Sequence, residues 1–273
     1  MAKRLESLLY VFLYLVIFVF SQLASIVMIP LCNTILKLIN GYTNPDSLIA
    51  FFLASVDRVD KGSVVVLVSS MVLSVLIFVY VMKIRNRSWK KAILKKTLGV
   101  REIIASFFLA YGLNILAIEI TAQPFFERFV VDYDTTITSI VTGDVYVIFL
   151  IVGILAPIFE ELMYRGVVLN ELSSARPFLL ANLLQAAVFG IMHMNVIQGT
   201  YAFVIGFILG YAYKITKSIY MTMLTHFLFN ASNLLVADYI SLLFNRQFFL
   251  SSGFAAILIS FLLMSRLLRR AGA

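Results

Sequence analysis

Long, uninterrupted apolar runs are the feature that most constrains how this chain can fold. The first extends from Leu8 to Leu36, and similar runs recur along the rest of the sequence. Of the 273 residues, 62% are hydrophobic and 13% are charged, whereas soluble domains carry about a quarter charged residues. A soluble domain could not bury so much apolar surface, so lipid is the expected solvent. Because the runs are continuous rather than alternating, helices are favoured over a β-barrel.

Hydropathy predicts an all-α fold, a polytopic transmembrane helical bundle of about eight spans, each near the ~20 residues that cross the hydrocarbon core. The first run is too long for the apolar core of a signal peptide, so we expect it to be a retained span. The predicted spans are 8–31, 63–82, 103–123, 145–165, 178–198, 200–215, 219–238 and 248–265.

The basic residues predict which ends of the spans face the cytoplasm. The loop from Lys83 to Arg101 carries eight Lys or Arg and no acidic residue, so the positive-inside rule places it in the cytoplasm. With this assignment both termini are cytoplasmic, and the acidic residues on the other side are Asp46, Asp57, Asp60, Glu127, Asp132, Asp134 and Asp238. The same loop forms either an amphipathic helix on the inner leaflet or a solvated connection. The other basic positions on this side are Met1–Arg4, Arg176, Lys214, Lys217 and Arg266–Arg270.

The net charge of +8 bears on the partners of the chain. In a soluble protein it would indicate nucleic acid. Here the basic residues cluster in short loops between apolar runs, which indicates membrane topology and contact with anionic headgroups. We therefore expect membrane lipids as partners and no nucleic acid.

Polar side chains inside apolar spans are costly, so they are candidate functional residues. The fourth span contains the segment LAPIFEELMYRG, with Glu160, Glu161 and Arg165. Glu161 and Arg165 are four residues apart and can pair on one helix face. Glu160 lies about 100° further round the helix and can face elsewhere. One carboxylate can thus be neutralised while the other remains available for acid–base chemistry; the alternative is a group of surface side chains that snorkel to the interface.

The chain has two histidines, and both fall inside predicted spans. Each lies on a predicted polar stripe with a spacing of three and four residues, typical of one helix face. An isolated intramembrane His is often a hydrogen-bonded structural residue, but two such stripes favour a common site. The stripes are Asn182, Gln185, Phe189 and His193, and Thr222, His226, Asn230 and Asn233. Helix-length arithmetic puts Glu160 and His193 at one depth, whereas His226 reaches it only if the first hairpin extends further into the cytoplasm.

Three motifs in order resemble those of the CAAX protease and bacteriocin-processing (CPBP, or Abi) family, the type II CAAX prenyl endopeptidases. They are E-E-x-x-x-R at 160–165, F-x-x-x-H at 189–193 and H-x-x-x-N at 226–230. The resemblance covers about residues 150–233. It implies N-terminal spans without a recognised motif at 1–144, a catalytic core at 145–240, and a C-terminal span with a basic tail at 241–273, within one structural domain.

The resemblance implies a glutamate-type intramembrane endopeptidase. Glu160 would be the general base that activates water, and His193 would help to hold that water. His226 and Asn230 would donate hydrogen bonds to the oxyanion, as preorganised donors must. The supporting residues would be Glu161, Arg165 and Phe189. The family also implies a membrane-associated peptide or protein substrate, and a location in the cell membrane, or in the endoplasmic reticulum of a eukaryote.

Several alternatives stay open at this stage. Glu160, His193 and His226 could instead bind zinc, although no H-E-x-x-H segment is present and no cofactor is expected. The chain could be a non-catalytic scaffold for a membrane-protein partner or a bacteriocin-immunity protein, or a proton-coupled transporter. No Ser or Cys lies in a comparable motif, so a covalent intermediate is not indicated. The single cysteine, Cys32, cannot form an internal disulfide and is expected to be inert packing.

Overall fold

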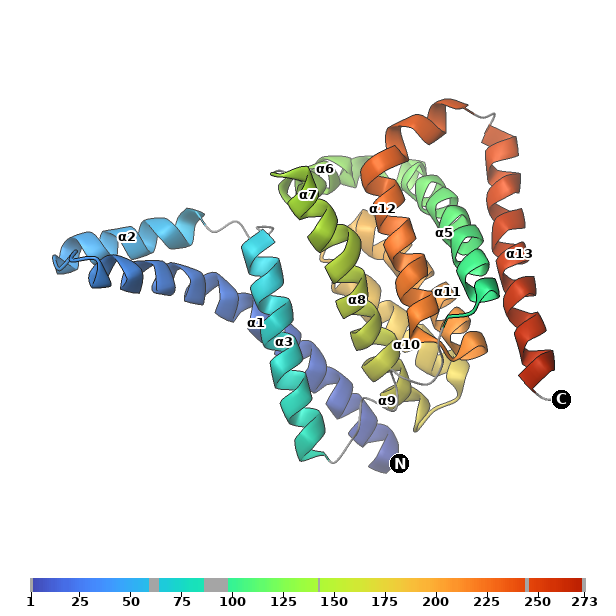
Figure 1. Cartoon of the computed structure of the whole chain (residues 1–273), viewed down its shortest axis with the longest axis horizontal. Helices are drawn as coiled ribbons and strands as arrows, with labels where there is room; N and C mark the ends of the chain where they lie inside the picture. Colours follow the sequence, from blue (N-terminus) through green and yellow to red (C-terminus); the bar gives the residue numbers. More distant parts are fainter. Residues whose placement is uncertain (1, 59–63, 86–97, 142, 244–245, 272–273) are drawn as a thin grey trace. The chain divides into compact units, whose positions relative to one another are not determined.

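The computed structural model describes residues 2–58, 64–85, 98–141, 143–243 and 246–271, and these residues form helices and short connections without a β-strand (Figure 1). The amphipathic helix considered for the Lys83–Arg101 loop falls largely outside the described residues. The α-helices are α1 (Ala2–Ile39), α2 (Pro45–Arg58), α3 (Val64–Ile84), α5 (Val100–Thr121), α6 (Val130–Val141), α7 (Val145–Ile148), α8 (Ala156–Glu161), α9 (Asn170–Ser173), α10 (Phe178–Ile191), α11 (Val196–Thr216), α12 (Ile219–Leu243) and α13 (Arg246–Ala271). A 3₁₀ helix, η1 (Pro124–Phe129), precedes α6, and π-helical segments η2 (Phe149–Leu155) and η3 (Leu162–Leu169) flank α8.

The helices confirm the predicted all-α, multi-pass membrane architecture. Six stretches of the described chain are long and apolar enough to cross a membrane. Large apolar side chains on their surfaces are exposed, as expected where lipid is the solvent. The six stretches are Ala2–Ile39, Val65–Ile84, Val100–Thr121, Val145–Ser173, Val196–Thr216 and Gln247–Ser265.

The predicted span at 178–198 is wrong in length. Helix α10 ends at Ile191, after 14 residues, and a turn leads into α11 at Val196. A helix of this length is shorter than the ~20 residues that cross the hydrocarbon core. The apolar run misled the prediction because it continues through the turn, where Met194 adopts a left-handed conformation with φ of 54°. The total number of spans and the side occupied by each terminus stay predictions.

The chain divides into two compact units. The first, here the N-terminal unit, comprises 9–87 and 136–142; the second, here the site unit, comprises 1–8, 88–135 and 143–273. Within the N-terminal unit, α1 packs on α3 through the buried Tyr14, whose ring meets that of Phe78 at 5.3 Å. The Arg85 guanidinium donates a hydrogen bond of 2.7 Å to the Tyr14 hydroxyl.

The core of the site unit lies between α5, α11, α12 and α13. Hydrogen bonds between helices reinforce this apolar core: Asn114 of α5 donates to Ser232 of α12 at 2.8 Å, and Ser260 of α13 donates to the carbonyl of Ala105 at 2.9 Å. Such bonds hold membrane helices together where the hydrophobic effect between helices is weak. The buried core residues are Ala105, Leu109, Leu113, Ala117, Ile205, Leu209, Ala212, Met221, Phe229 and Met264.

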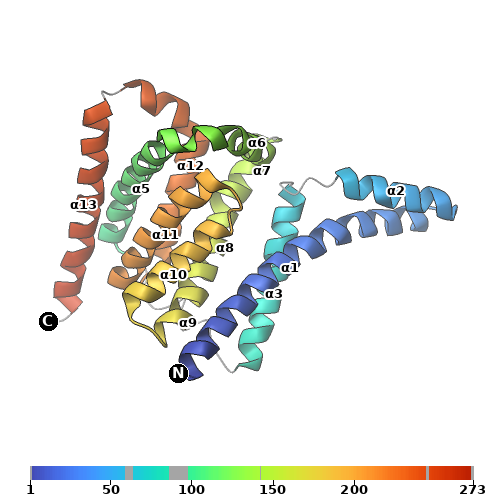
Figure 2. The same cartoon turned by 180° about the vertical axis from the view of Figure 1, so that it is seen from behind.

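The connections of the site unit lie at two opposite ends. Helix α9, the α11–α12 turn and the end of α13 lie at one end, and α6, the end of α12 and the start of α13 lie at the other (Figures 1 and 2). Arg176, in the turn after α9, donates to the carbonyl of Arg4, so the N-terminal residues share the first end. The turn with Arg176 and the α11–α12 turn with Lys217 therefore lie at the same end of this unit as Arg4, and the side of the membrane that this end faces stays a prediction.

Candidate functional site

The two glutamates lie in α8, the short α-helical stretch between the two π-helical segments. The whole stretch Val145–Ser173 is one continuous helix. A π-helical turn shifts the hydrogen-bond register from i→i+4 to i→i+5, and such turns are frequent at functional sites. Here they leave backbone carbonyls of Val152, Arg165 and Gly166 able to accept bonds from Asn side chains.

The structure separates Glu160 from Glu161 as the sequence predicts. Glu161 is fully buried and accepts a hydrogen bond of 2.7 Å from Arg165, which is also fully buried. The Glu160 side chain retains 23% exposure. Glu160 is therefore the carboxylate that a substrate or a water molecule can reach, while Glu161 is part of a buried ion pair.

His226 connects the two carboxylates. Its Nδ1 lies 2.9 Å from Oε1 of Glu161, and its Nε2 lies 3.7 Å from Oε2 of Glu160. Glu161 thus holds one ring nitrogen and directs the other toward Glu160. The sequence predicted that His226 reaches the depth of Glu160 only if the first hairpin extends further than the second. This condition is met, because the α9–α10 turn extends beyond the α11–α12 turn (Figure 1).

His193 lies in the turn that follows α10, not within a helix as predicted. Its Nδ1 is 2.7 Å from the carbonyl oxygen of Phe189, and its ring interacts electrostatically with Glu160 and His226. A carbonyl can only accept, so Nδ1 carries the proton and Nε2 of the neutral ring is an acceptor. The turn therefore fixes which nitrogen is available for a ligand.

Phe189 packs at the centre of these side chains. Its buried ring lies 4.8 Å from the ring of His193 and 5.9 Å from that of His226, both edge to face. The Arg165 guanidinium stacks 4.9 Å from the same ring, and Tyr164 contacts it at 4.8 Å. Phe189 thus holds both histidines and the arginine in place.

The polar stripe predicted on α12 holds for Thr222, His226 and Asn230, whereas Asn233 departs from it. Thr222 and His226 are buried, and Asn230 donates a hydrogen bond of 2.9 Å to the Val152 carbonyl in η2. Asn233 is exposed and donates back to the carbonyl of Phe229. The predicted site residues on α12 are thus His226 and Asn230, without Asn233.

Two backbone carbonyls of the site had no signal in the sequence. The Val152 oxygen binds Asn230, and the Gly206 oxygen binds Arg165 and Gln185. Every residue has a carbonyl, so composition and spacing cannot indicate which of them a side chain will use. The polar stripe of α10 did indicate that Asn182 and Gln185 face the interior, and both are fully buried.

Within the described part of the chain, no group of three or more His, Cys, Asp or Glu side chains is arranged to hold a metal ion. Of the ligands considered for zinc, Glu160 and His226 approach within 3.7 Å, and the rings of His193 and His226 both pack on Phe189.

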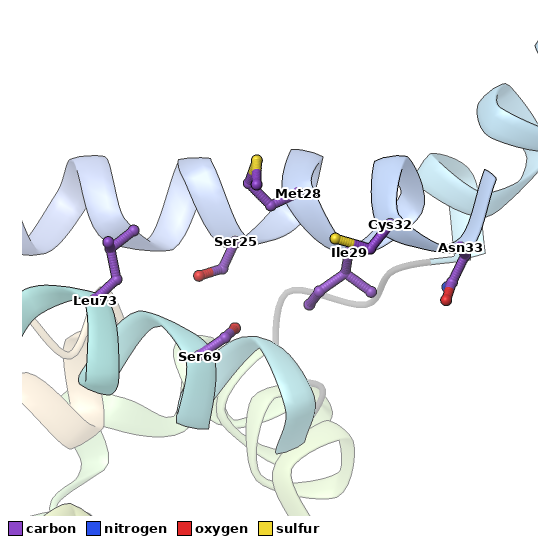
Figure 3. Close-up of a pocket in the computed structure, with 7 residues that line it drawn as sticks. All are labelled: Ser25, Met28, Ile29, Cys32, Asn33, Ser69 and Leu73. Atoms are coloured by element: carbon purple, nitrogen blue, oxygen red, sulfur yellow. The ribbon is translucent and has the colours of Figure 1, made fainter. Parts of the chain in front are cut away.

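A separate groove of about 370 Å³ lies between α1 and α3 in the N-terminal unit (Figure 3). It contains none of the predicted site residues, and its walls carry serine, asparagine and cysteine as their only polar side chains. Cys32 is a free and exposed thiol at this groove rather than buried packing. The lining residues are Ser25, Met28, Ile29, Cys32, Asn33, Ser69 and Leu73.

Fold and site together define an integral multi-pass membrane protein with a carboxylate- and histidine-bearing site between its helices. A family model described as Rce1-like, type II CAAX prenyl endopeptidase Rce1-like, matches residues 142–232. This range contains all three motifs, so the predicted resemblance to the CAAX proteases is confirmed there. The family is one of proteases, which supports a peptidase. Comparisons with curated proteins and with solved structures gave no match.

Proposed function

We propose that the chain is an intramembrane endopeptidase that hydrolyses a peptide bond of a membrane-associated substrate with water activated by Glu160 and His193. The observation that carries the proposal is the arrangement of His226, with Nδ1 at 2.9 Å from the buried Glu161 and Nε2 at 3.7 Å from the accessible Glu160. A structural ion pair would need only one of these carboxylates. Here the buried carboxylate neutralises Arg165, and the accessible one remains free to transfer a proton as a general base.

Water activation is assigned to the two acceptors that face the site. The Glu160 carboxylate accepts protons, and so does Nε2 of His193 while Nδ1 donates to Phe189. A water molecule that donates to both would have its oxygen lone pairs directed at a substrate carbonyl. Glu160 then removes the proton as general base and can transfer it to the leaving amine.

Oxyanion stabilisation is assigned to the α12 residues. Because the Nδ1 proton of His226 points to Glu161, Nε2 can donate to an oxyanion only when the ring carries both protons. Asn230 uses one N–H on the Val152 carbonyl and retains the other. The Val152 bond fixes the amide before any charge develops, which is the requirement for efficient oxyanion stabilisation.

The test is cleavage of reporter peptides by the purified protein in detergent. A farnesylated C-terminal CAAX peptide, its unprenylated counterpart and a broad peptide library serve as substrates. Glu160→Gln is expected to lower kcat by about 10²–10⁴-fold, and His226→Ala by about 10²–10³-fold, as for loss of an oxyanion donor. Size-exclusion profiles and thermal midpoints confirm that the variants remain folded.

Each other result has a defined meaning. Cleavage that persists in Glu160→Gln would refute the assignment of the base. Loss of activity with a chelator, restored by zinc, would replace the metal-free mechanism by a metalloprotease. If the whole library stays intact while the wild type is folded, catalysis is wrong and a scaffold or immunity role takes its place.

A further inference from the structure

We infer that Gln185 is a positioning residue, which fixes Arg165 through a shared backbone carbonyl and thereby sets the orientation of Glu161 and His226. The inference rests on the proposed function and adds residues that none of the three motifs contains. Gln185 lies in α10 and is fully buried, so a substrate in contact with the surface of the protein does not reach it. Any role in the reaction must therefore act through its neighbours.

The shared carbonyl belongs to Gly206 of α11. Gln185 Nε2 donates to it at 2.9 Å, and Arg165 Nη2 donates to it at 3.2 Å. From Arg165 the bonds continue to Glu161 at 2.7 Å and from there to His226 at 2.9 Å. An unbroken series of buried bonds thus joins α10 and α11 to the histidine that faces Glu160.

Asn182 fixes the orientation of the Gln185 amide. Its Oδ1 accepts from Gln185 Nε2 at 3.0 Å, and its own Nδ2 donates to the Phe207 carbonyl at 2.9 Å. An acceptor at this place selects the NH₂ end of Gln185 and so directs a donor, not an oxygen, at Gly206. Gly210 provides the room, since a Cβ there would collide with Asn182 Oδ1.

A purely structural reading is that the two amides only satisfy one another. It leaves unexplained why polar side chains occupy a position where apolar residues would pack at lower cost in lipid. It also leaves unexplained why the amide series ends on the carbonyl that binds Arg165. Without the Gln185 donor, the Gly206 carbonyl loses one of the two side chains that bind it, and the acceptor of Arg165 is less firmly placed. Misplacement by about 1 Å can lower a rate about 10²-fold.

The first test compares Gln185→Met, which keeps the length of the side chain and removes the donors, with Asn114→Leu. Asn114 is a matched control because its buried amide bonds Ala110 and Ser232 outside the network. Gln185→Met is expected to lower kcat by about 10–100-fold with KM within about threefold, whereas Asn114→Leu keeps kcat near that of the wild type. Equal losses in both variants, or a change in KM alone, would overturn the inference.

A double-mutant cycle with Arg165→Lys supplies the second readout. If Gln185 acts through Arg165, the combined loss in kcat is no larger than the greater single loss, whereas independent sites multiply. The same cycle in thermal midpoint needs no activity, so it tests the coupling even if no substrate is cleaved and the proposed function fails. If the two single-variant shifts in thermal midpoint simply add in the double variant, the inference is wrong. This result would say nothing about why no substrate was cleaved, so the two failures stay distinguishable.

If Gln185→Met does not fold, Gly210→Ala disturbs the network from its far end. The new methyl displaces the flexible Asn182 amide, and Ala is itself a better helix former than Gly. A fall in kcat with KM unchanged is expected. Activity equal to that of the wild type would show that the hydrogen bonds of Asn182 and Gln185 do not position Arg165 for the reaction.

Discussion

Glu160 and Glu161 are neighbours in the chain, yet their surroundings assign them different physical roles. Glu161 neutralises Arg165 where neither side chain contacts solvent or lipid. Removal of one partner from a buried pair leaves an uncompensated charge and costs about 3–5 kcal/mol. Glu161→Gln is therefore expected to lower the thermal midpoint markedly, measured in detergent.

Glu160→Gln is the matched control for Glu161→Gln, because the same chemical change is made at the neighbouring residue. The Glu160 side chain is partly exposed, and Arg165 makes its hydrogen bond to Glu161 instead, so we expect a change within about 1 kcal/mol. A second variant, Glu161→Gln with Arg165→Met, removes both charges and should regain stability over Glu161→Gln alone. Equal stability of the two single variants would contradict the buried-pair interpretation.

At the element scale, α10 and α11 form a closely packed hairpin. A Cβ at Gly190 would lie 2.5 Å from the carbonyl oxygen of Gly199, so the two backbones meet without side chains between them. Small residues permit such contact between membrane helices. Gly190→Ala must push the helices apart, and overpacking costs about 1–3 kcal/mol. Since Phe189 and His193 flank this contact, we expect a lower thermal midpoint and reduced cleavage.

Gly153→Ala is the control for Gly190→Ala. Its Cβ would meet only ring atoms of Phe149, at 3.4 Å and beyond, which is ordinary packing distance. The substitution should leave the thermal midpoint unchanged or raise it slightly, since Ala favours a helix more than Gly does. If both variants behave alike, the close helix contact does not limit stability.

The elements also show how far the sequence could predict the fold and the site. Apolar runs locate most spans because lipid imposes a length and a composition on them. They did not locate the end of α10, since the turn is only four residues long and has apolar residues on both sides and two methionines within it. Asn195, which accepts from the backbone N–H groups of Ile197 and Gln198, was the available signal for a new helix start. The sequence contained no signal for the π-helical segments, because hydropathy does not distinguish i→i+5 from i→i+4 hydrogen bonding in a helix.

For the whole molecule, the distribution of charge predicts the orientation in the membrane. The α9–α10 turn, which contains Arg176, and the α11–α12 turn, which contains Lys217, lie at one end of the site unit (Figures 1 and 2). Helix α6, which contains Asp132, and the start of α7, which Asp144 caps, lie at the other end. The positive-inside rule places the basic end in the cytoplasm. A substrate entering from the cytoplasm would then approach past the turns that hold Arg176 and Lys217.

Labelling of single cysteines with a membrane-impermeant maleimide tests this orientation. Cys32→Ser comes first, because that thiol is free and exposed. Tyr146→Cys, at a position 82% exposed beside Asp144, is expected to react in intact cells. Lys217→Cys is expected to react only after permeabilisation. The reverse pattern would turn the site unit over in the membrane and move substrate access to the other face, while leaving the buried pair and the histidines as they are.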